Sequence, residues 1–289
     1  MKTSQKIIVV SCTCLLVIVS VGCAAAARKL YTAKAERRAA KEAAQNIEKE
    51  IQELEKEVEE LEKEQAQREA EGKKEVITGE QPQAKGKKIA IDPGHQGPNV
   101  DMSDLEPMGP GSQEMKAKAS SGTQGRYTNV PEYELTLNIS KQLRLELEQR
   151  GYEVVLTRED HDTAISNSER ALMAAEEGSD IYVRIHANGA MTMVPSAENP
   201  YVGALHPKSY ALGESVINAY CQECGMENDG VQLYDNMTGI NWSQIPVIIL
   251  EMGYMTNEQD DVNMQDPEYE KKMVKGIANG IDQYFAAGN

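Results

Sequence analysis

Four short runs of aliphatic residues, separated by amphipathic segments, restrict the fold of this chain most strongly. The runs lie at residues 88–91, 154–156, 181–185 and 247–250. Between and after them, apolar residues at helical spacing predict helices at residues 132–150, 170–175, 209–224 and from residue 267 onward. Strands that alternate with helices are typical of an α/β domain. We therefore expect a mixed or mostly parallel open sheet flanked by helices over residues 87–289.

The first 30 residues are expected to be a targeting segment. Lys2 and Lys6 precede an apolar run over residues 7–27, which has about the 20 residues that a bilayer span requires. An uncleaved membrane anchor fits this length best, while a cleaved signal peptide and a lipoprotein signal ending at Cys23 are alternatives. Basic residues follow the run, and by the positive-inside rule they would keep the domain in the cytoplasm.

A long helix is expected over residues 31–71. Its apolar residues alternate at spacings of four and three between Ala40 and Leu61, as in the seam of a coiled coil. We expect residues 40–61 to form a homodimer or to contact a partner helix; a single solvated helix held by Glu–Lys pairs is the alternative. Residues 72–86 contain Gly, Pro and Gln without periodicity and are predicted to be a linker.

Charge and cysteine content exclude some functions. The net charge of −16 argues against a nucleic-acid partner, because no basic stripe is present to neutralise phosphates. Cys221 and Cys224 form a CxxC pair without a second pair to complete a metal site. They fall late in a predicted helix, so we interpret their spacing as a coincidence of the helix and leave a disulfide open.

Three of the predicted strands are followed by a side chain that can bind a metal or carry a proton. These are His95, His186 and Glu251. Because ligands of open α/β sheets bind outside the carboxyl ends of the strands, the three should converge if their strands are parallel neighbours. His161 and His206 have no such placement, and we do not expect them to be ligands.

Four motifs resemble those of a known family. They are IAIDPGH at residues 89–95, EYELTL at 132–137, RIHAN at 184–188 and PVIILEMGYMTN at 246–257. In this order they resemble the zinc-dependent N-acetylmuramoyl-L-alanine amidases of bacterial cell walls. The resemblance covers residues 87–289 and implies a zinc-dependent amidase/exopeptidase-like fold for that domain.

The resemblance also implies the metal ligands and the catalytic base. It places one Zn²⁺ per catalytic domain on His95, Glu132 and His186, with Glu134 as the rival carboxylate. Two imidazoles and one carboxylate leave a fourth position for water, which is typical of catalytic rather than structural zinc. Glu251 corresponds to the catalytic glutamate, and partial burial should raise its pKa toward neutrality. A salt bridge at the end of the sheet is the alternative role for Glu251.

The implied substrate is peptidoglycan, cut between N-acetylmuramic acid and L-alanine of the stem peptide. Asp92, Asn188 and Arg170 are candidates to orient the ligands or the substrate, although Asp92 and Asn188 could equally cap the turn and the strand end. The long connection at residues 96–131 should line the substrate groove. We expect that deleting residues 100–125 would impair substrate binding more than zinc content.

The implied substrate determines where we expect the domain to act. It requires an extracytoplasmic domain, either membrane-anchored or secreted to the cell wall, and we give it precedence over the positive-inside rule. Two other hypotheses are a catalytically silent wall-binding or scaffolding protein that uses the coiled coil for partners, and a zinc peptidase that acts on another amide.

Overall fold

The computed structural model describes residues 85–288 together with Lys41, Lys49 and Lys56. The chain divides into two units, residues 1–80 and residues 81–289. The anchor expected over residues 1–30, the stalk over 31–71 and the linker over 72–86 therefore lie outside the described residues, apart from these three lysines, which are helical, and two linker positions. Within the described part of the chain, no helix combines the length and the apolar character needed to cross a membrane.

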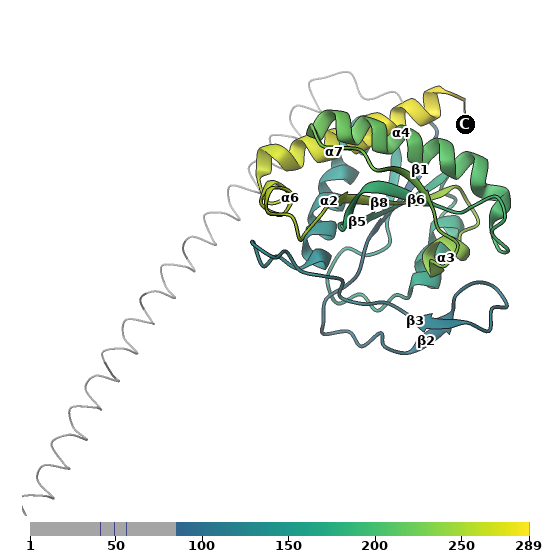
Figure 1. Ribbon diagram of the computed structural model, residues 1–289, viewed down its shortest axis with the longest axis horizontal. Helices are drawn as coiled ribbons and strands as arrows, with labels where there is room; N and C mark the ends of the chain where they lie inside the picture. Colours follow the sequence, from purple (N-terminus) through teal and green to yellow (C-terminus); the bar gives the residue numbers. More distant parts are fainter. Residues whose placement is uncertain (1–40, 42–48, 50–55, 57–84, 289) are drawn as a thin grey trace, which may run out of the picture. The chain divides into compact units, whose positions relative to one another are not determined.

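A six-stranded sheet forms the centre of the domain, in the order β4-β1-β5-β8-β6-β7 (Figure 1). Four neighbouring strands are parallel: β4 (Glu153–Leu156), β1 (Lys88–Pro93), β5 (Ile181–His186) and β8 (Val247–Gly253). Strand β6 (Gly189–Val194) runs antiparallel to β8, and β7 (Gly230–Leu233) runs parallel to β6. The expected mixed, mostly parallel α/β sheet is thus confirmed, and all four predicted strands are present.

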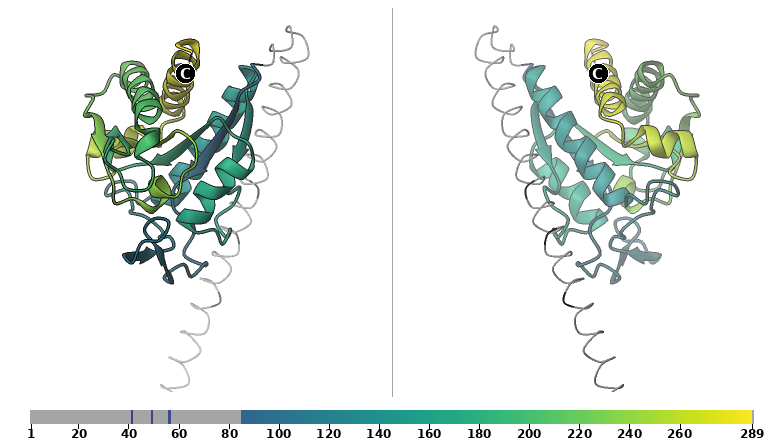
Figure 2. Two further views of the ribbon diagram at one scale, coloured as in Figure 1. Left: turned by 90° about the vertical axis from the view of Figure 1, so that its right-hand side faces the viewer. Right: turned by 90° about the vertical axis from the view of Figure 1, so that its left-hand side faces the viewer.

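Helices cover both faces of the sheet because neighbouring side chains on each strand point to opposite faces. Ile89 and Ile91 belong to an apolar cluster with α2 (Glu132–Gln149), α4 (His206–Cys224) and α7 (Pro267–Ala286). Ala90 belongs to a second cluster with α3 (Asn167–Glu176) and α5 (Thr238–Asn241). Figure 2 shows α4 and α7 side by side on one side of the sheet. The remaining helical segments are η1 (Gly203–Leu205) and α6 (Glu258–Asn263).

The helix ends follow local sequence signals. Ser166 and Glu169 form a reciprocal capping box at the start of α3, and Asp266 accepts two backbone N–H groups at the start of α7. Gly225 ends α4 in the left-handed conformation. Cys221 and Cys224 lie in the last turn of α4, late in a helix as predicted, and their thiols are free.

The segment at residues 96–131 contains more structure than the sequence predicts. Its strands β2 (Leu105–Pro107) and β3 (Met115–Ala117) form an antiparallel hairpin, which the absence of any apolar periodicity did not indicate. Trp242 Nε1 donates to the Pro107 carbonyl at 2.9 Å and fixes the hairpin to the turn after α5. The hairpin lies on the opposite side of the domain from α4 and α7 (Figures 1 and 2).

Candidate metal centre and active site

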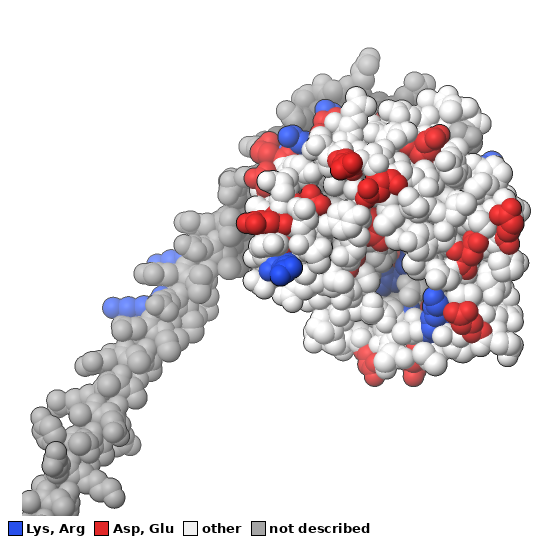
Figure 3. Space-filling view, in the orientation of Figure 1, with Lys and Arg blue, Asp and Glu red and all other residues white. Residues whose placement is uncertain are grey.

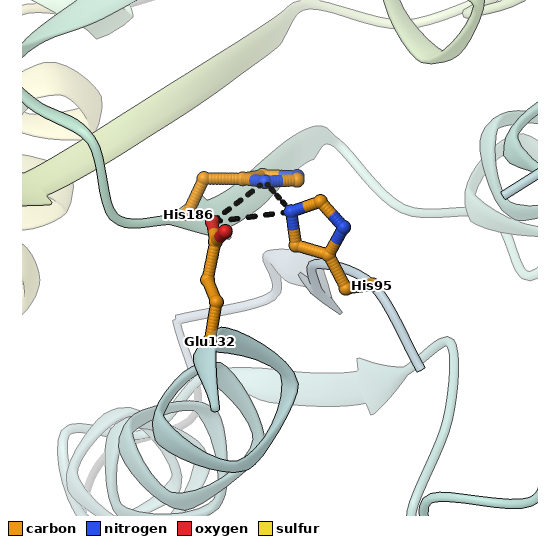
Figure 4. Close-up of side chains that lie close together, drawn as sticks. All are labelled: His95, Glu132 and His186. Carbon is orange, nitrogen blue, oxygen red and sulfur yellow. Dashed lines mark hydrogen bonds and ion pairs between the residues drawn. The ribbon is translucent and has the colours of Figure 1, made fainter. Parts of the chain in front are cut away.

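His95, Glu132 and His186 converge at the carboxyl ends of the central strands (Figure 4). His95 Nε2 lies 3.1 Å from Glu132 Oε1 and 3.1 Å from His186 Nδ1. His186 Nδ1 lies 3.5 Å from Glu132 Oε1. These residues come from the turn after β1, the first turn of α2 and the last position of β5. Within the described residues, this is the group of side chains whose ligand atoms are placed to hold one metal ion.

The turn after β1 brings His95 against β5. An added Cβ at Gly94 would lie 2.5 Å from the His186 ring and 2.5 Å from the Ile185 carbonyl, so a side chain there would separate the two strands. His95 itself adopts a positive φ of 63°, which is uncommon for a residue with a side chain. Such a conformation persists only where surrounding contacts hold it. The Asp-Pro-Gly-His turn therefore holds the imidazole of His95 in position.

Further hydrogen bonds orient the three side chains. His95 Nδ1 lies 3.2 Å from the Ser120 carbonyl and 3.1 Å from its hydroxyl. A proton on Nδ1 would leave the Nε2 lone pair facing the cluster, as metal-bound histidines require. Glu132 accepts from the backbone N–H groups of Thr123 and Ala187, both at 3.0 Å. Ser120 and Thr123 were not predicted, because a serine and a threonine in a polar loop carry no signal of this role.

The protonation states of His186 and Glu132 favour metal binding. Burial lowers the pKa of His186 to about 4, helped by the nearby charges of His95 and Arg184, so its ring is neutral at physiological pH. Burial alone would raise the pKa of Glu132, but its close contacts with the His186 and His95 rings hold that pKa well below its usual value. Tetrahedral zinc with bonds of about 2.0–2.1 Å separates its ligand atoms by about 3.3 Å. The separations of 3.1–3.5 Å and the donor types therefore fit such an ion.

Glu251 lies beside this cluster on β8, where it is the register partner of His186 on β5. Only 7 % of its surface is exposed. Burial raises its pKa to about 7, with a further contribution from the charge of Glu132, while the Asn188 N–H and Arg184 oppose the shift. Asn188 N–H donates to Glu251 Oε2 at 2.6 Å. A carboxyl with a pKa near neutrality can both accept and release a proton at physiological pH.

Asp92 and Arg170 belong to a buried polar cluster beneath the ligands. Asp92 accepts from Arg170 Nη1 and Arg184 Nε, both at 2.7 Å, and also from the Thr157 hydroxyl. Arg170 Nη2 donates to the His95 carbonyl at 3.0 Å. Asp92 thus contacts no ligand side chain, and Arg170 contacts the backbone of the ligand-bearing turn.

The cluster opens into a cavity of about 460 Å³. His95, Glu132, His186, Asn188 and Glu251 line one part of it, as do Arg170 and Arg184. The part of the 96–131 segment that lines the cavity comprises Lys116, Ala117, Ala119, Ser120, Gly122 and Thr123. The segment thus borders the cavity, as expected; that this cavity receives the substrate stays a prediction. Glu134 is exposed, and neither it nor His161 or His206 lines the cavity.

Comparison with solved structures agrees with the observed fold. The amidase Ami1 of Mycobacterium smegmatis is 24 % identical, covers 70 % of this chain and 98 % of its own, and superposes with a TM-score of 0.63. The apo form of the N-acetylmuramyl-L-alanine amidase Ami1 of Mycobacterium abscessus is 27 % identical over 69 % of this chain and 99 % of its own, with a TM-score of 0.62.

Sequence comparison finds a relative and a family. The probable cell wall amidase LytH of Staphylococcus aureus is 28 % identical over 210 residues, which is 73 % of this chain. The aligned part spans 62 % of that relative's length. The model of the N-acetylmuramoyl-L-alanine amidase family matches residues 89–283, and so includes all three ligand candidates and Glu251. On this match the chain belongs to the N-acetylmuramoyl-L-alanine amidase family.

Proposed function

We propose that residues 87–289 form a zinc-dependent peptidoglycan hydrolase that cleaves the amide bond between N-acetylmuramic acid and L-alanine. One observation carries the proposal: two imidazole nitrogens and a carboxylate oxygen lie within 3.5 Å of one another at the wall of a cavity that also contains the buried Glu251. Family membership and the relatives described as amidases support the choice of bond.

The reaction divides between the ligands and Glu251. His95, Glu132 and His186 would hold zinc through Nε2, Oε1 and Nδ1. When bound, zinc would lower the pKa of water and polarise the scissile carbonyl. Glu251 accepts a proton from the attacking water and returns it to the departing amide nitrogen, a role that its pKa of about 7 suits. The Asn188 N–H holds Glu251 Oε2 in place during both transfers.

Digestion of purified peptidoglycan tests this function. The full-length chain loaded with zinc should release new free N-terminal L-alanine, and both a chelator and the Glu251→Gln substitution should abolish the release. The substitution removes the proton acceptor but keeps the shape of the side chain, so zinc content should stay at one ion per chain.

The same digest decides between the hypotheses. Absence of new N-terminal alanine at full zinc occupancy would reject the amidase and favour the wall-binding or scaffolding protein. No observation on the described residues favours that alternative, because the three ligand candidates and Glu251 are all present and converge.

We also propose that the domain acts outside the cytoplasm, where its substrate lies, and that residues 1–30 carry it there as an anchor or a signal. The S. aureus relative is described as a cell wall amidase, which supports this location. Residues 31–71 would then separate the domain from the membrane and offer residues 40–61 to a second copy or a partner helix. Cell fractionation and crosslinking of the intact chain test both points; recovery from the cytoplasm as a monomer would contradict them.

A further inference from the structure

Three basic residues line the cavity of this otherwise acidic chain. They are Lys116 on β3, Arg170 on α3 and Arg184 on β5. Figure 3 shows blue Lys and Arg atoms inside a hollow above the β2–β3 hairpin, whereas the surface around it carries many red Asp and Glu side chains. Positive charge is therefore present inside the recess that also contains the ligand cluster.

Three buried arginines and one buried aspartate lie below the cavity. Arg158, Arg170 and Arg184 are 2 %, 1 % and 4 % exposed. Asp92, which has no exposed surface, accepts hydrogen bonds from Arg170 and Arg184 but not from Arg158. Arg158 donates only to carbonyl oxygens and to the hydroxyl of Thr136. A buried charge is costly unless it is paired. Glu132 and Glu251 also line the cavity but belong to the ligand cluster. Because Arg170 and Arg184 share the single carboxylate of Asp92, this pair keeps one positive charge that would favour an anionic ligand.

Arg184 is the arginine whose guanidinium is best placed for this ligand. Its Nε donates to Asp92 Oδ2 at 2.7 Å and its Nη2 to Asn167 Oδ1 at 2.8 Å. Its Nη1 donates to no carboxylate or amide of the described residues and lies against Gly239, where an added Cβ would be 1.9 Å away. The side chain is thus held rigidly on two sides, and the absence of a side chain at Gly239 keeps room for Nη1 at the cavity.

The position of Arg184 matches the reach of a stem peptide. Arg184 precedes His186 by two residues on β5, so both side chains share one face of the sheet at a separation of about 6.6 Å along the strand. From the scissile carbonyl, the carboxylate on the residue after L-alanine is about 7 Å away in an extended peptide, since consecutive Cα atoms are 3.8 Å apart. The sugar side of the bond offers neutral hydroxyl and acetamide groups at this distance.

We propose that Arg184 binds a free carboxylate of the stem peptide, on the residue that follows L-alanine. The inference rests on the proposed function and adds a specificity to it: the enzyme distinguishes a stem whose second residue carries a free carboxylate from one in which that group is amidated. A guanidinium recognises a carboxylate through charge-assisted hydrogen bonds, which a neutral carboxamide cannot match.

Two matched soluble muropeptides test the proposal. They are identical except that the second stem residue carries either a free carboxylate or a carboxamide. Their affinities are measured by calorimetry on the full-length zinc-loaded chain with Glu251→Gln, which binds without cleavage, and their kcat/KM values on the chain with Glu251 intact. Arg184→Gln removes the guanidinium, and Gly239→Ala displaces it while keeping its charge. Arg144→Gln is the control, because Arg144 pairs with Glu159 outside the cavity.

We expect the carboxylate muropeptide to bind about tenfold or more tightly than the carboxamide. Arg184→Gln and Gly239→Ala should remove this preference by weakening the carboxylate form alone, and Arg144→Gln should keep it. If Arg184 only supported Glu251 or the fold, its loss would reduce kcat/KM for both muropeptides equally, and that result would overturn the proposal. Equal affinity of the unsubstituted site for the two forms, or affinity for neither, would also overturn it. Preferential binding without hydrolysis of either form would instead reject the proposed function and uphold the role of Arg184.

Discussion

Glu132 shows most clearly what a single residue contributes. From the sequence it is one of two acidic residues in the first turn of a helix, where the helix dipole favours any carboxylate. Only the family resemblance separates it from Glu134. In the structure Glu132 is 1 % exposed and faces both histidines, whereas Glu134 is exposed. The distinction depends on the position of α2 relative to β1 and β5, which local sequence patterns do not encode.

Replacing Glu132 should therefore affect the metal far more than replacing its neighbour. Glu132→Gln removes one charged ligand, and we expect zinc affinity to fall by more than about 100-fold, since even residues that only orient a ligand change it by 10- to 100-fold. Glu134→Gln makes the same chemical change two residues away and should leave affinity unchanged. Competition with a chelating dye measures both. Equal affinities of the two variants would exclude Glu132 as a ligand.

At the scale of elements, the strands that were predicted are those with uninterrupted aliphatic runs. Strand β6 reads GAMTMV and β7 reads GVQL, and neither has the run of β-branched residues that marks a strand. β6 is a strand because it pairs with β8, almost sixty residues later in the chain. The β2–β3 hairpin is likewise held by contacts with distant residues, such as Trp242. Contacts with distant residues thus explain why the sequence did not indicate β2, β3 and β6. The fourth missed strand, β7, lies at the edge of the sheet and pairs with β6.

The structure indicates which residues can be deleted to remove the hairpin without removing contacts to the metal ligands. A deletion of residues 100–125 would also remove Ser120 and Thr123, which contact His95 and Glu132. Lys118 N–H donates to the Asp104 carbonyl at 2.9 Å, so the two ends of the hairpin meet. A two-residue turn in place of residues 105–117 should keep zinc affinity and lower muropeptide affinity about tenfold, because Lys116 and Ala117 no longer border the cavity. Parallel loss of zinc would contradict this division of roles.

The carboxyl end of β1 depends on the ion cluster around Asp92. Burial would raise the pKa of Asp92, but the charges of Arg170 and Arg184 and the Thr157 hydroxyl hold it far below its usual value. Asp92→Asn leaves these arginines without their carboxylate, and we expect the free energy of unfolding at pH 7 to fall by about 3–5 kcal/mol. Urea unfolding of the metal-free chain measures this loss.

The difference in unfolding free energy between the wild-type chain and Asp92→Asn should also depend on pH. Because the folded pKa of Asp92 lies below its unfolded value of about 3.9, its ionised form stabilises the fold above that pH. This contribution is lost as the pH falls toward the folded pKa, so the difference between the wild-type chain and Asp92→Asn should shrink below about pH 4. A difference that stays constant from pH 7 to pH 3 would show that Asp92 acts through its shape alone. Asp104→Asn, at an exposed position, is the control and should change stability by less than about 0.5 kcal/mol.

At the scale of the whole molecule, the net charge does not tell where the charged residues lie. A net charge of −16 argues against a nucleic-acid partner, yet it gives no indication that Lys116, Arg170 and Arg184 share one recess. The fold class and the three strand-end residues follow from local patterns, and the proposed bond rests on the family match. The charge distribution inside the cavity required the packed structure, because it brings together residues from β3, α3 and β5.

The most direct test of the central claim is the identity of the new chain ends in peptidoglycan digested by the zinc-loaded chain. Mass spectrometry of the products counts these ends. We predict free N-terminal L-alanine and free lactyl carboxyl groups in equal amounts, with neither formed by the Glu251→Gln chain. New amino termini at any other stem residue, or new reducing sugar ends, would contradict the assignment of this site to the N-acetylmuramoyl-L-alanine bond.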